Sequence, residues 1–164
     1  MFSLEGKKAI VTGAARGLGR GMAYALHKAC ADVVLIDILD DVEITKNQFT
    51  SSLADVYSLK GDLSDSESRQ LLFQEAVQLL GGELDILVNA AGINVKGPST
   101  EFSLDSWNKT LEINVTAVFE LSRLAGRIMV EQKRGKIINI GSITSFTGHI
   151  NGTAYSASKG AISQ

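Results

Sequence analysis

The feature that most constrains this chain is an alternation of short apolar runs with longer amphipathic stretches. Each run is rich in Val, Ile or Leu and is closed by Gly, Asp or Asn. Such runs are typical of buried strands in a parallel sheet, where both faces are covered and the alternation of polar and apolar residues disappears. We expect strands at 9–12, 33–36, 56–59, 84–88 and 137–140.

The stretches between these runs have helical periodicity. One helix is expected after Ser64 or Asp65, either of which could cap it, and before Gly81 and Gly82. Its apolar positions are Leu71, Leu72, Ala76, Leu79 and Leu80, and its other faces carry Glu67, Arg69, Gln70, Gln74 and Glu75. A longer helix is expected at 104–132, with Ser103 as its cap. Alternating strands and helices predict an α/β fold, a Rossmann-type doubly wound parallel sheet, in a single domain.

A glycine loop follows the first expected strand and reads Thr-Gly-Ala-Ala-Arg-Gly-Leu-Gly over residues 12–19. Glycines at such a turn let backbone N–H groups approach a pyrophosphate, which the positive end of the following helix also attracts. The spacing G-x-x-x-G-x-G differs from the usual G-x-G-x-x-G, so a tight strand–helix turn is the alternative. The candidate cofactor-binding residues here are Gly13, Arg16, Gly17, Leu18 and Gly19.

An acidic residue follows the second expected strand. Asp37 lies at the distance from the glycine loop where a carboxylate accepts hydrogen bonds from the adenosine ribose. Its charge would repel the 2′-phosphate of NADP, and Ile38 stands where a basic residue would bind that phosphate. Arg16 argues the other way, because it could reach a 2′-phosphate. We give Asp37 the greater weight and expect NAD, with NADP the less favoured cofactor; the alternative for Asp37 is a solvated loop carboxylate.

Near the end of the chain stand Tyr155 and Lys159, which lie on one face if the segment is helical. A nearby ammonium stabilises a phenolate, the form that a tyrosine needs to accept a proton. Ser142 follows the last expected strand, and the carboxyl ends of parallel strands border the active crevice. Ser142 could therefore meet Tyr155 over a substrate carbonyl. The Y-x-x-x-K pair gains weight only together with the glycine loop and Asp37.

Composition excludes several classes of function. The net charge is −2 with both signs spread along the chain, which argues against a nucleic-acid partner or an anionic membrane. One Cys and two His make an internal disulfide impossible and a metal site improbable, so we expect no metal. The N-terminus does not read as a secretory signal, and no run is long enough for a membrane span. We expect a cytoplasmic protein with a small-molecule partner.

Taken together, the motifs resemble the short-chain dehydrogenase/reductases. The match spans nearly the whole chain, and the motifs stand in the family's order. The residues that carry it are Thr12-Gly13-x-x-x-Gly17-x-Gly19, Asp62-Leu63, Asn89-Ala90-Ala91-Gly92, Asn114, Ser142 and Tyr155-x-x-x-Lys159. The resemblance implies an oxidoreductase that transfers a hydride between a nicotinamide cofactor and an alcohol or ketone.

The resemblance also implies catalytic roles. Tyr155 is the proton donor or acceptor at the carbonyl oxygen, and Lys159 holds the nicotinamide ribose and favours the tyrosinate. Ser142 hydrogen-bonds the substrate oxygen, and Asn114 supports a water in the proton relay. The alternative for Asn114 is a helix-interior asparagine bonded to backbone. The other serines that could take the role of Ser142 are Ser145 and Ser158, but they lack the family's spacing to the tyrosine.

Further cofactor contacts are implied in the same way. Asp62 and Leu63 resemble the family's adenine contacts, although Asp62 could simply end a strand. The segment with Asn89, Ala90 and Gly92 resembles the one that stabilises the central sheet and borders the cofactor. The family's usual second asparagine is Ala90 here, a change that we expect to be tolerated.

The substrate class is suggested by two stretches, 2–7 and 135–140, which resemble sugar-acid and polyol dehydrogenases of the gluconate and deoxygluconate type. Two alternatives stay open: an NADPH-dependent 3-ketoacyl carrier-protein reductase, which Asp37 argues against, and a non-catalytic nucleotide-binding fragment. A full-length enzyme of this family is expected to assemble as a homodimer or homotetramer.

The length is short for the chemistry. Members of this family usually continue for about another half of this length, so we expect a domain that is truncated and incomplete at its C-terminal end. Residues 135–141 would then form an apolar edge strand, which favours aggregation. We expect little or no turnover from the 164 residues alone.

Overall fold

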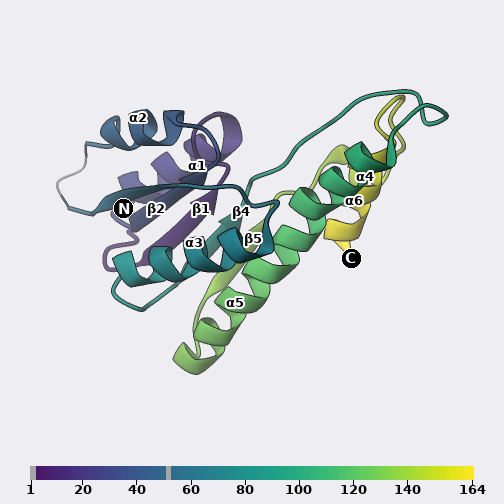
Figure 1. The fold of residues 1–164 in the computed structure, drawn as a ribbon. Coiled ribbons are helices and arrows are strands. Elements are labelled where there is room, and N and C mark those ends of the chain that lie inside the picture. The colour runs from purple at the N-terminus through teal and green to yellow at the C-terminus, as the bar shows by residue number, and fades with distance from the viewer. Residues whose placement is uncertain (1–2, 51–52) are drawn as a thin grey trace.

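The computed structural model describes residues 3–50 and 53–164. Its centre is a parallel sheet with the strand order β3-β2-β1-β4-β5 (Figure 1). The strands are β1 (Lys8–Thr12), β2 (Asp32–Asp37), β3 (Val56–Lys60), β4 (Ile86–Asn89) and β5 (Lys136–Asn139). Every pairing is parallel. The expected Rossmann-type α/β sheet is therefore confirmed, with small shifts at the strand ends.

Helices connect the strands. They are α1 (Gly17–Lys28), α2 (Asp41–Asn47), α3 (Ser66–Leu79), α4 (Leu104–Leu111), η1 (Glu112–Thr116), α5 (Ala117–Gln132), η2 (Ile143–Ser145) and α6 (Thr153–Ser163). The short helix α2 was not expected. Of the two caps considered for α3, Asp65 is the one used, because its side chain accepts a hydrogen bond from Ser68 N.

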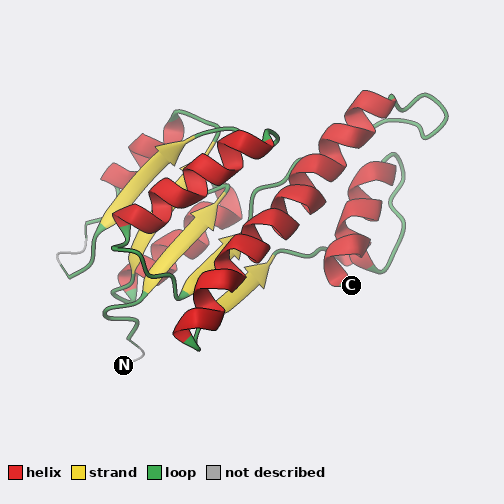
Figure 2. Cartoon of the chain, turned by 60° about the horizontal axis from the view of Figure 1, so that its bottom comes forward, coloured by secondary structure: helices red, strands yellow, loops and turns green. Residues whose placement is uncertain are grey.

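The helices cover both faces of the sheet, as Figure 2 shows. On one face, Ile10 and Leu87 pack with Leu72 of α3 and Leu121 of α5. On the other face, a second core is built on α1 and α2; its strand residues include Val11, Leu35 and Val88. Neighbouring strand residues serve opposite faces, which is why these strands lack polar positions.

The long helix expected at 104–132 is helical throughout but not uniform. Ser103 caps it as expected, accepting a hydrogen bond from Ser106 N. Between α4 and α5, the turn η1 is π-helical, which means that one extra residue is accommodated in the turn. Asn114 lies in this turn, so the extra residue alters the direction of a predicted site residue.

Arg69 was expected on a polar face of α3, and this prediction is wrong. Its residue is only 1% exposed, whereas Leu71, expected on the apolar side, is 59% exposed. The reason is that α5 packs against this side of α3 and supplies a carboxylate for the guanidinium. Partners distant in sequence thus make burial of a charge tolerable.

The edge strand β5 carries apolar side chains in contact with solvent. Ile137 is 38% exposed and Ile138 is 44% exposed. Beyond this edge, α4, α6 and the loops 93–103 and 146–152 extend away from the sheet (Figure 1). The two loops touch, since Gly97 N donates to Asn151 O at 3.0 Å. Within the described residues, no helix combines the length and the apolar character needed to cross a membrane.

Candidate active site

A cleft of about 420 Å³ opens where the strand order reverses, between the carboxyl ends of β1 and β4. This is the position at which doubly wound sheets bind ligands. Predicted cofactor residues that line it are Gly13, Arg16, Leu18, Gly19, Asp37, Asp62, Leu63, Ala90 and Gly92. Lining residues that the sequence did not single out as binding residues are Ile38, Leu39, Gly61, Ala91, Ile93, Lys109 and Ile113. The structure thus brings most of the predicted cofactor residues to one cleft.

The glycines of the loop differ in why they are needed. A Cβ at Gly19 would lie 2.1 Å from Gly13 O, so no side chain fits there. A Cβ at Gly13 would lie 2.7 Å from Ala91 Cα, and its φ of +65° also favours glycine. Gly17 has a φ of +59° and open space around it, and it is not among the lining residues. Gly13 and Gly19 are needed because a side chain would clash with nearby backbone, and Gly17 is needed because of its positive φ.

Thr12, the last residue of β1, holds the wall of the cleft that is formed by the segment after β4. Its buried Oγ1 accepts hydrogen bonds from Ala90 N at 3.1 Å and Ala91 N at 3.2 Å. The same hydroxyl donates to Val88 O at 3.4 Å. The chain after β4 is therefore held beside the glycine loop, which sets the width of the cleft.

Asp37 ends β2 and is not the solvated loop carboxylate that stood as its alternative, because the residue is only 9% exposed. Its Oδ2 accepts from Ala15 N at 2.9 Å, and its Oδ1 accepts from Leu39 N at 3.1 Å. The carboxylate thus joins β2 to the glycine loop while it lines the cleft. A carboxyl group fixed in this place can accept hydrogen bonds from ligand hydroxyls.

The far wall of the cleft carries Asp62 and Leu63. Ser64 N donates to Asp62 Oδ1 at 2.8 Å, and this hydrogen bond lowers the pKa of the Asp62 carboxyl. Lys109 of α4, also in the lining, adds to this effect by its positive charge. Asp62 is consequently an anion that can accept a hydrogen bond from an amino group of a ligand.

Asn89 serves the framework rather than the cleft lining. Its Nδ2 donates to Asn139 Oδ1 at 2.9 Å and to Ser122 Oγ at 3.1 Å, which joins β4 to β5 and α5. Its buried Oδ1 has no hydrogen-bond partner among the described residues. The arrangement supports the expected role in stabilising the central sheet.

Asn114 connects three parts of the molecule from the π-helical turn. Its Oδ1 accepts from Ile93 N and its Nδ2 donates to Ile93 O, both at 2.9 Å. Its Nδ2 also donates to Ser158 Oγ of α6 at 3.0 Å. The side chain does bond to backbone, as the alternative had it, but to the segment after β4 rather than within its own helix. Asn114 thereby joins the cleft wall to the helix that carries Tyr155.

Tyr155 and Lys159 both lie in α6, as the i, i+4 spacing predicts. Lys159 Nζ lies 5.7 Å from the centre of the Tyr155 ring. The ammonium also donates to Ile140 O at 2.6 Å, just after β5. Lys159 is only 7% exposed, and this burial lowers the pKa of its ammonium. The pair is therefore fixed beside the carboxyl end of the sheet with a positive charge next to the phenol.

Ser142 lies at the start of η2. Its Oγ accepts from Thr144 N at 3.2 Å and from Thr144 Oγ1 at 3.0 Å, so its own proton can be donated to a ligand oxygen. The competing hydroxyls donate to main-chain oxygens of α6: Ser145 to Lys159 O and Ser158 to Tyr155 O. These two serines bond to α6, whereas Ser142 Oγ, within the described residues, accepts both of its hydrogen bonds from Thr144.

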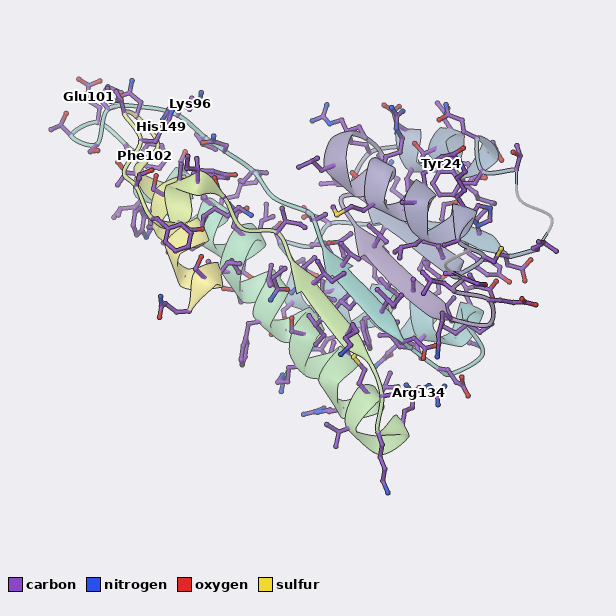
Figure 3. All side chains as sticks on the ribbon, turned by 180° about the vertical axis from the view of Figure 1, so that it is seen from behind. Tyr24, Lys96, Glu101, Phe102, Arg134 and His149 are labelled. Atoms are coloured by element: carbon purple, nitrogen blue, oxygen red, sulfur yellow. The ribbon has the colours of Figure 1, made fainter. Side chains whose placement is uncertain are left out.

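The projecting end of the molecule carries two loops whose side chains lie close together. Figure 3 shows Lys96, Glu101, Phe102 and His149 gathered there, far from Tyr24 and Arg134. These side chains belong to the loops 93–103 and 146–152, which flank the start of α6. Among the described residues, no cluster of three or more His, Cys, Asp or Glu is placed to hold a metal ion.

This arrangement suits a dinucleotide. The amino end of α1, where backbone N–H groups lack helical partners, opens into the cleft at Leu18 and Gly19. A Cβ on Gly13 or Gly19 would occupy space that the loop needs to stay compact. Asp37 and Asp62 line the part of the cleft beside β2 and β3, where the adenosine end of a dinucleotide would lie. Tyr155 and Lys159 in α6 and Ser142 at the start of η2 are not among the lining residues and form a second group of polar side chains. The cleft residues therefore fit a nicotinamide cofactor, and the second group suits proton transfer at a carbonyl.

Comparison with known proteins agrees with this geometry. The short chain dehydrogenase family model matches residues 7–164. The chain is 40% identical to 2-dehydro-3-deoxy-D-gluconate 5-dehydrogenase of Dickeya dadantii, over 98% of this chain and 63% of that protein. It is 35% identical to 5-keto-D-gluconate 5-reductase of Escherichia coli K12, over 99% of this chain and 64% of that protein.

Solved structures are similar as well. A Beutenbergia cavernae protein, assigned as an NAD(P)-dependent gluconate 5-dehydrogenase and holding NADP at low occupancy, matches with a TM-score of 0.91 and 35% identity. It is covered over 64% of its length and this chain over 98%. A Sinorhizobium meliloti protein assigned as a short-chain alcohol dehydrogenase has a TM-score of 0.93 at 33% identity. The chain spans slightly less than two thirds of the length of the relatives described here. With its cleft, its motifs and its family match in agreement, this chain belongs to the short-chain dehydrogenase family.

Proposed function

We propose that this chain carries the cofactor-binding domain and the acid–base residues of a dehydrogenase that interconverts an alcohol and a ketone on a sugar acid. The observation that carries the proposal is the Tyr155–Lys159 pair, held in α6 with its ammonium 5.7 Å from the phenol ring. The names of the similar proteins from Dickeya dadantii and Escherichia coli support a sugar acid as the substrate class.

A nicotinamide cofactor held in the cleft would supply the hydride acceptor for oxidation of the substrate carbon and the hydride donor for the reverse reaction. Ser142 donates a hydrogen bond to the substrate oxygen and orients it. Tyr155, as a phenolate beside the ammonium of Lys159, takes the hydroxyl proton during oxidation and gives it back during reduction. Asn114 holds α6 through Ser158, which keeps Tyr155 in reach of the substrate.

Tyr155→Phe tests the proposed acid–base role. This variant keeps the ring but removes the proton carrier, so we expect kcat to fall by about 10²–10⁴-fold with cofactor binding little changed. The matched control is Tyr24→Phe in α1, whose ring packs edge-on against Phe49 with the centroids 5.6 Å apart. Because little or no turnover is expected from the 164 residues alone, activity is measured in a fusion that adds the part of the Dickeya dadantii relative that the match does not cover. The substrate pairs are 2-dehydro-3-deoxy-D-gluconate with NAD, and 5-keto-D-gluconate with NADH. Equal losses in the two variants would contradict the role of Tyr155.

Comparing cofactor binding with turnover distinguishes an enzyme from a non-catalytic nucleotide-binding module. Binding is followed by the fluorescence of Trp107 in α4, the only Trp of the chain. Binding together with turnover supports the dehydrogenase. Binding without turnover in the same fusion supports a non-catalytic module for these residues, and the absence of binding would overturn both.

We infer further that NAD is preferred over NADP. The support is Asp37, whose buried carboxylate lines the cleft and would repel a 2′-phosphate. Asp37→Asn removes the charge and keeps the shape, so the ratio of the two dissociation constants should shift toward NADP by about 10-fold or more. The control is Asp62→Asn, which should weaken both cofactors alike. An unchanged ratio in Asp37→Asn would remove this residue from the proposed role.

A further inference from the structure

The buried guanidinium of Arg69 is the group in this fold whose function the catalytic scheme does not explain. It lies on α3 with 1% of its side chain exposed. Nη1 donates to Leu63 O at 2.5 Å and to Glu112 Oε1 at 2.7 Å. Nε donates to Glu120 Oε2 at 2.8 Å, and Nη2 lies at the same distance from that oxygen. A single side chain therefore bonds to a loop, a π-helical turn and a helix.

Stability alone is a poor reason to bury such a group. Removing a guanidinium and carboxylates from water is costly, and apolar side chains of similar volume often stabilise a core as well. Around it this side of α3 is apolar, with Leu72, Phe73 and Ala76 buried in the same helix. Arg69 instead supplies donors with fixed directions, which an apolar residue cannot do.

The partners of Arg69 are parts of the functional site. Leu63 lines the cleft at its adenosine end. Glu112 begins the turn η1, in which the next residue, Ile113, also lines the cleft and Asn114 bonds to the segment after β4. Asn114 continues the series of hydrogen bonds through Ser158 to Tyr155 O. One connected network thus joins the adenosine end of the cleft to the helix of the proposed acid–base pair.

In this network the one guanidinium of Arg69 is shared by two acidic side chains, Glu112 and Glu120. The hydrogen bond from Arg69 lowers the pKa of the Glu120 carboxyl, so Glu120 is an anion at neutral pH. Glu120 also accepts from Ser66 Oγ at 3.2 Å, at the start of α3. Loss of the guanidinium would leave Glu112 and Glu120 without their shared cation, so η1 and α5 would lose their ionic attachment to α3.

We propose that Arg69 is a positioning residue that holds the adenosine wall of the cleft and the π-helical turn of Asn114 in a fixed relation. This inference rests on the proposed cofactor-binding function. Through Leu63 O, Arg69 sets the cleft wall, and through Glu112 it sets the turn that carries Asn114. Cofactor binding and the placement of Asn114 are therefore coupled through one guanidinium.

The test compares Arg69→Met and Arg69→Lys with Arg134→Met in the full chain. Arg134 also bonds two carboxylates, Glu83 and Asp85, but at the amino end of the strands, away from the cleft. For each variant the Tm is measured, and the dissociation constants of NAD and AMP are measured well below that Tm. We expect Arg69→Met to weaken both ligands by about 10-fold or more, Arg69→Lys to lie between it and the unmodified chain, and Arg134→Met to lower the Tm without changing either constant.

A second measurement guards against misfolding of Arg69→Met. Hydrogen exchange in Arg69→Lys and in Glu112→Gln should speed up at Ile93 N and across 112–116 and leave α1 unchanged, because Asn114 holds that amide. In the double variant that combines Arg69→Lys with Glu112→Gln, the fold loss of NAD affinity should be smaller than the product of the two single fold losses. The reason is that both substitutions break the same contact.

Results of three kinds would decide the matter. Nucleotide affinity equal to that of the unmodified chain in Arg69→Lys and Glu112→Gln would overturn the positioning role and leave the proposed function standing. Faster exchange spread evenly over the chain would also overturn it, because this indicates general destabilisation. An unmodified chain that binds neither NAD nor NADP would overturn the proposed function and this inference together.

Discussion

The two ends of strands β1 and β4 use polar groups in opposite ways. At their amino end, Asp85 accepts hydrogen bonds from Lys7 Nζ, Lys8 N and Arg134 Nε. Its own backbone also pairs with β1 and β5, through Lys8 O and Lys136 N. The charges of Asp85, Lys7 and Arg134 there pair with one another and join strands β1, β4 and β5. At the carboxyl end, by contrast, polar side chains hold backbone segments beside one another around an open cleft.

This difference teaches how one sheet separates stability from function. The amino end joins three strands with a single 5% exposed carboxylate and leaves no lining residue of the cleft nearby. The carboxyl end relies on glycines and on Thr12, which fix close approaches between chain segments. Substitutions at the amino end should therefore change the free energy of unfolding, and those at the carboxyl end should change binding.

The largest effect is expected for Gly19→Ala. The added Cβ would lie 2.1 Å from Gly13 O, so the loop must shift and the amino end of α1 must withdraw from the cleft. Affinity for NAD should fall by about 100-fold or more, which corresponds to about 2.7 kcal/mol. Titration calorimetry measures this loss.

Gly21→Ala is the matched control for this prediction. Gly21 lies two residues further along the same helix, and a Cβ there meets nothing within 4 Å. The substitution should raise helix stability by about 0.5–1 kcal/mol and leave affinity unchanged. Equal binding in the two alanine variants would show that close approach in the loop does not govern the cleft.

At the opposite end, Asp85→Asn should destabilise without affecting the cofactor. The substitution weakens hydrogen bonds to two cations and a backbone amide, and we expect a loss of about 2–3 kcal/mol in the free energy of unfolding. Denaturant titration measures this loss. Glu83→Gln is the control, because the side chain of Glu83 is 54% exposed and its ion pair is with Arg134 Nη2. A loss of NAD affinity in Asp85→Asn, measured on folded protein, would break the proposed separation of the two ends.

The pH dependence of stability gives a second test of the role of Asp85 at the amino end. Burial by itself would raise the pKa of Asp85, but hydrogen bonds from Arg134, Lys8 N and Lys7 hold this pKa below its usual value. A carboxyl with a lowered folded-state pKa stabilises the fold above its unfolded pKa of about 3.9, and this contribution is lost as the pH falls through the folded value. The stability difference between the unmodified chain and Asp85→Asn should therefore be full at neutral pH and shrink below about pH 4. A difference that stays constant into acid would mean that the charge of Asp85 contributes nothing.

The sequence predicted the parts that depend on local patterns. The strands follow from their apolar runs, and the cleft follows from the glycine loop at the end of β1. For the cap of α3 the sequence offered Ser64 or Asp65, and the structure selects Asp65. Burial of Arg69 was not predicted, because its carboxylate partners Glu112 and Glu120 come from distant segments and a helical arginine is usually solvated. The π-helical turn was missed for a similar reason, since its extra residue does not disturb the apolar periodicity of the chain around it.

The site shows the same division. Spacing placed Tyr155 and Lys159 on one helical face, but it did not reveal that Lys159 Nζ donates to Ile140 O. The position of Asp37 indicated a ribose contact, but not that its oxygens hold Ala15 N and Leu39 N. Residue types and intervals predict which groups meet, whereas tertiary packing decides which backbone segments they also hold.

The smallest effect, and the most informative about the cleft, is expected for Thr12→Val. This substitution keeps the shape of the side chain but leaves Ala90 N and Ala91 N without their acceptor, which should cost about 1–2 kcal/mol of stability. The segment after β4 should then lie less firmly beside the glycine loop, and NAD affinity should fall by about 3–10-fold. Thr12→Ser keeps the hydroxyl and should restore most of the affinity. If Thr12→Val loses stability and keeps full affinity, then Thr12 resembles Asp85, and the contrast between the two ends of the strands does not extend to the walls of the cleft.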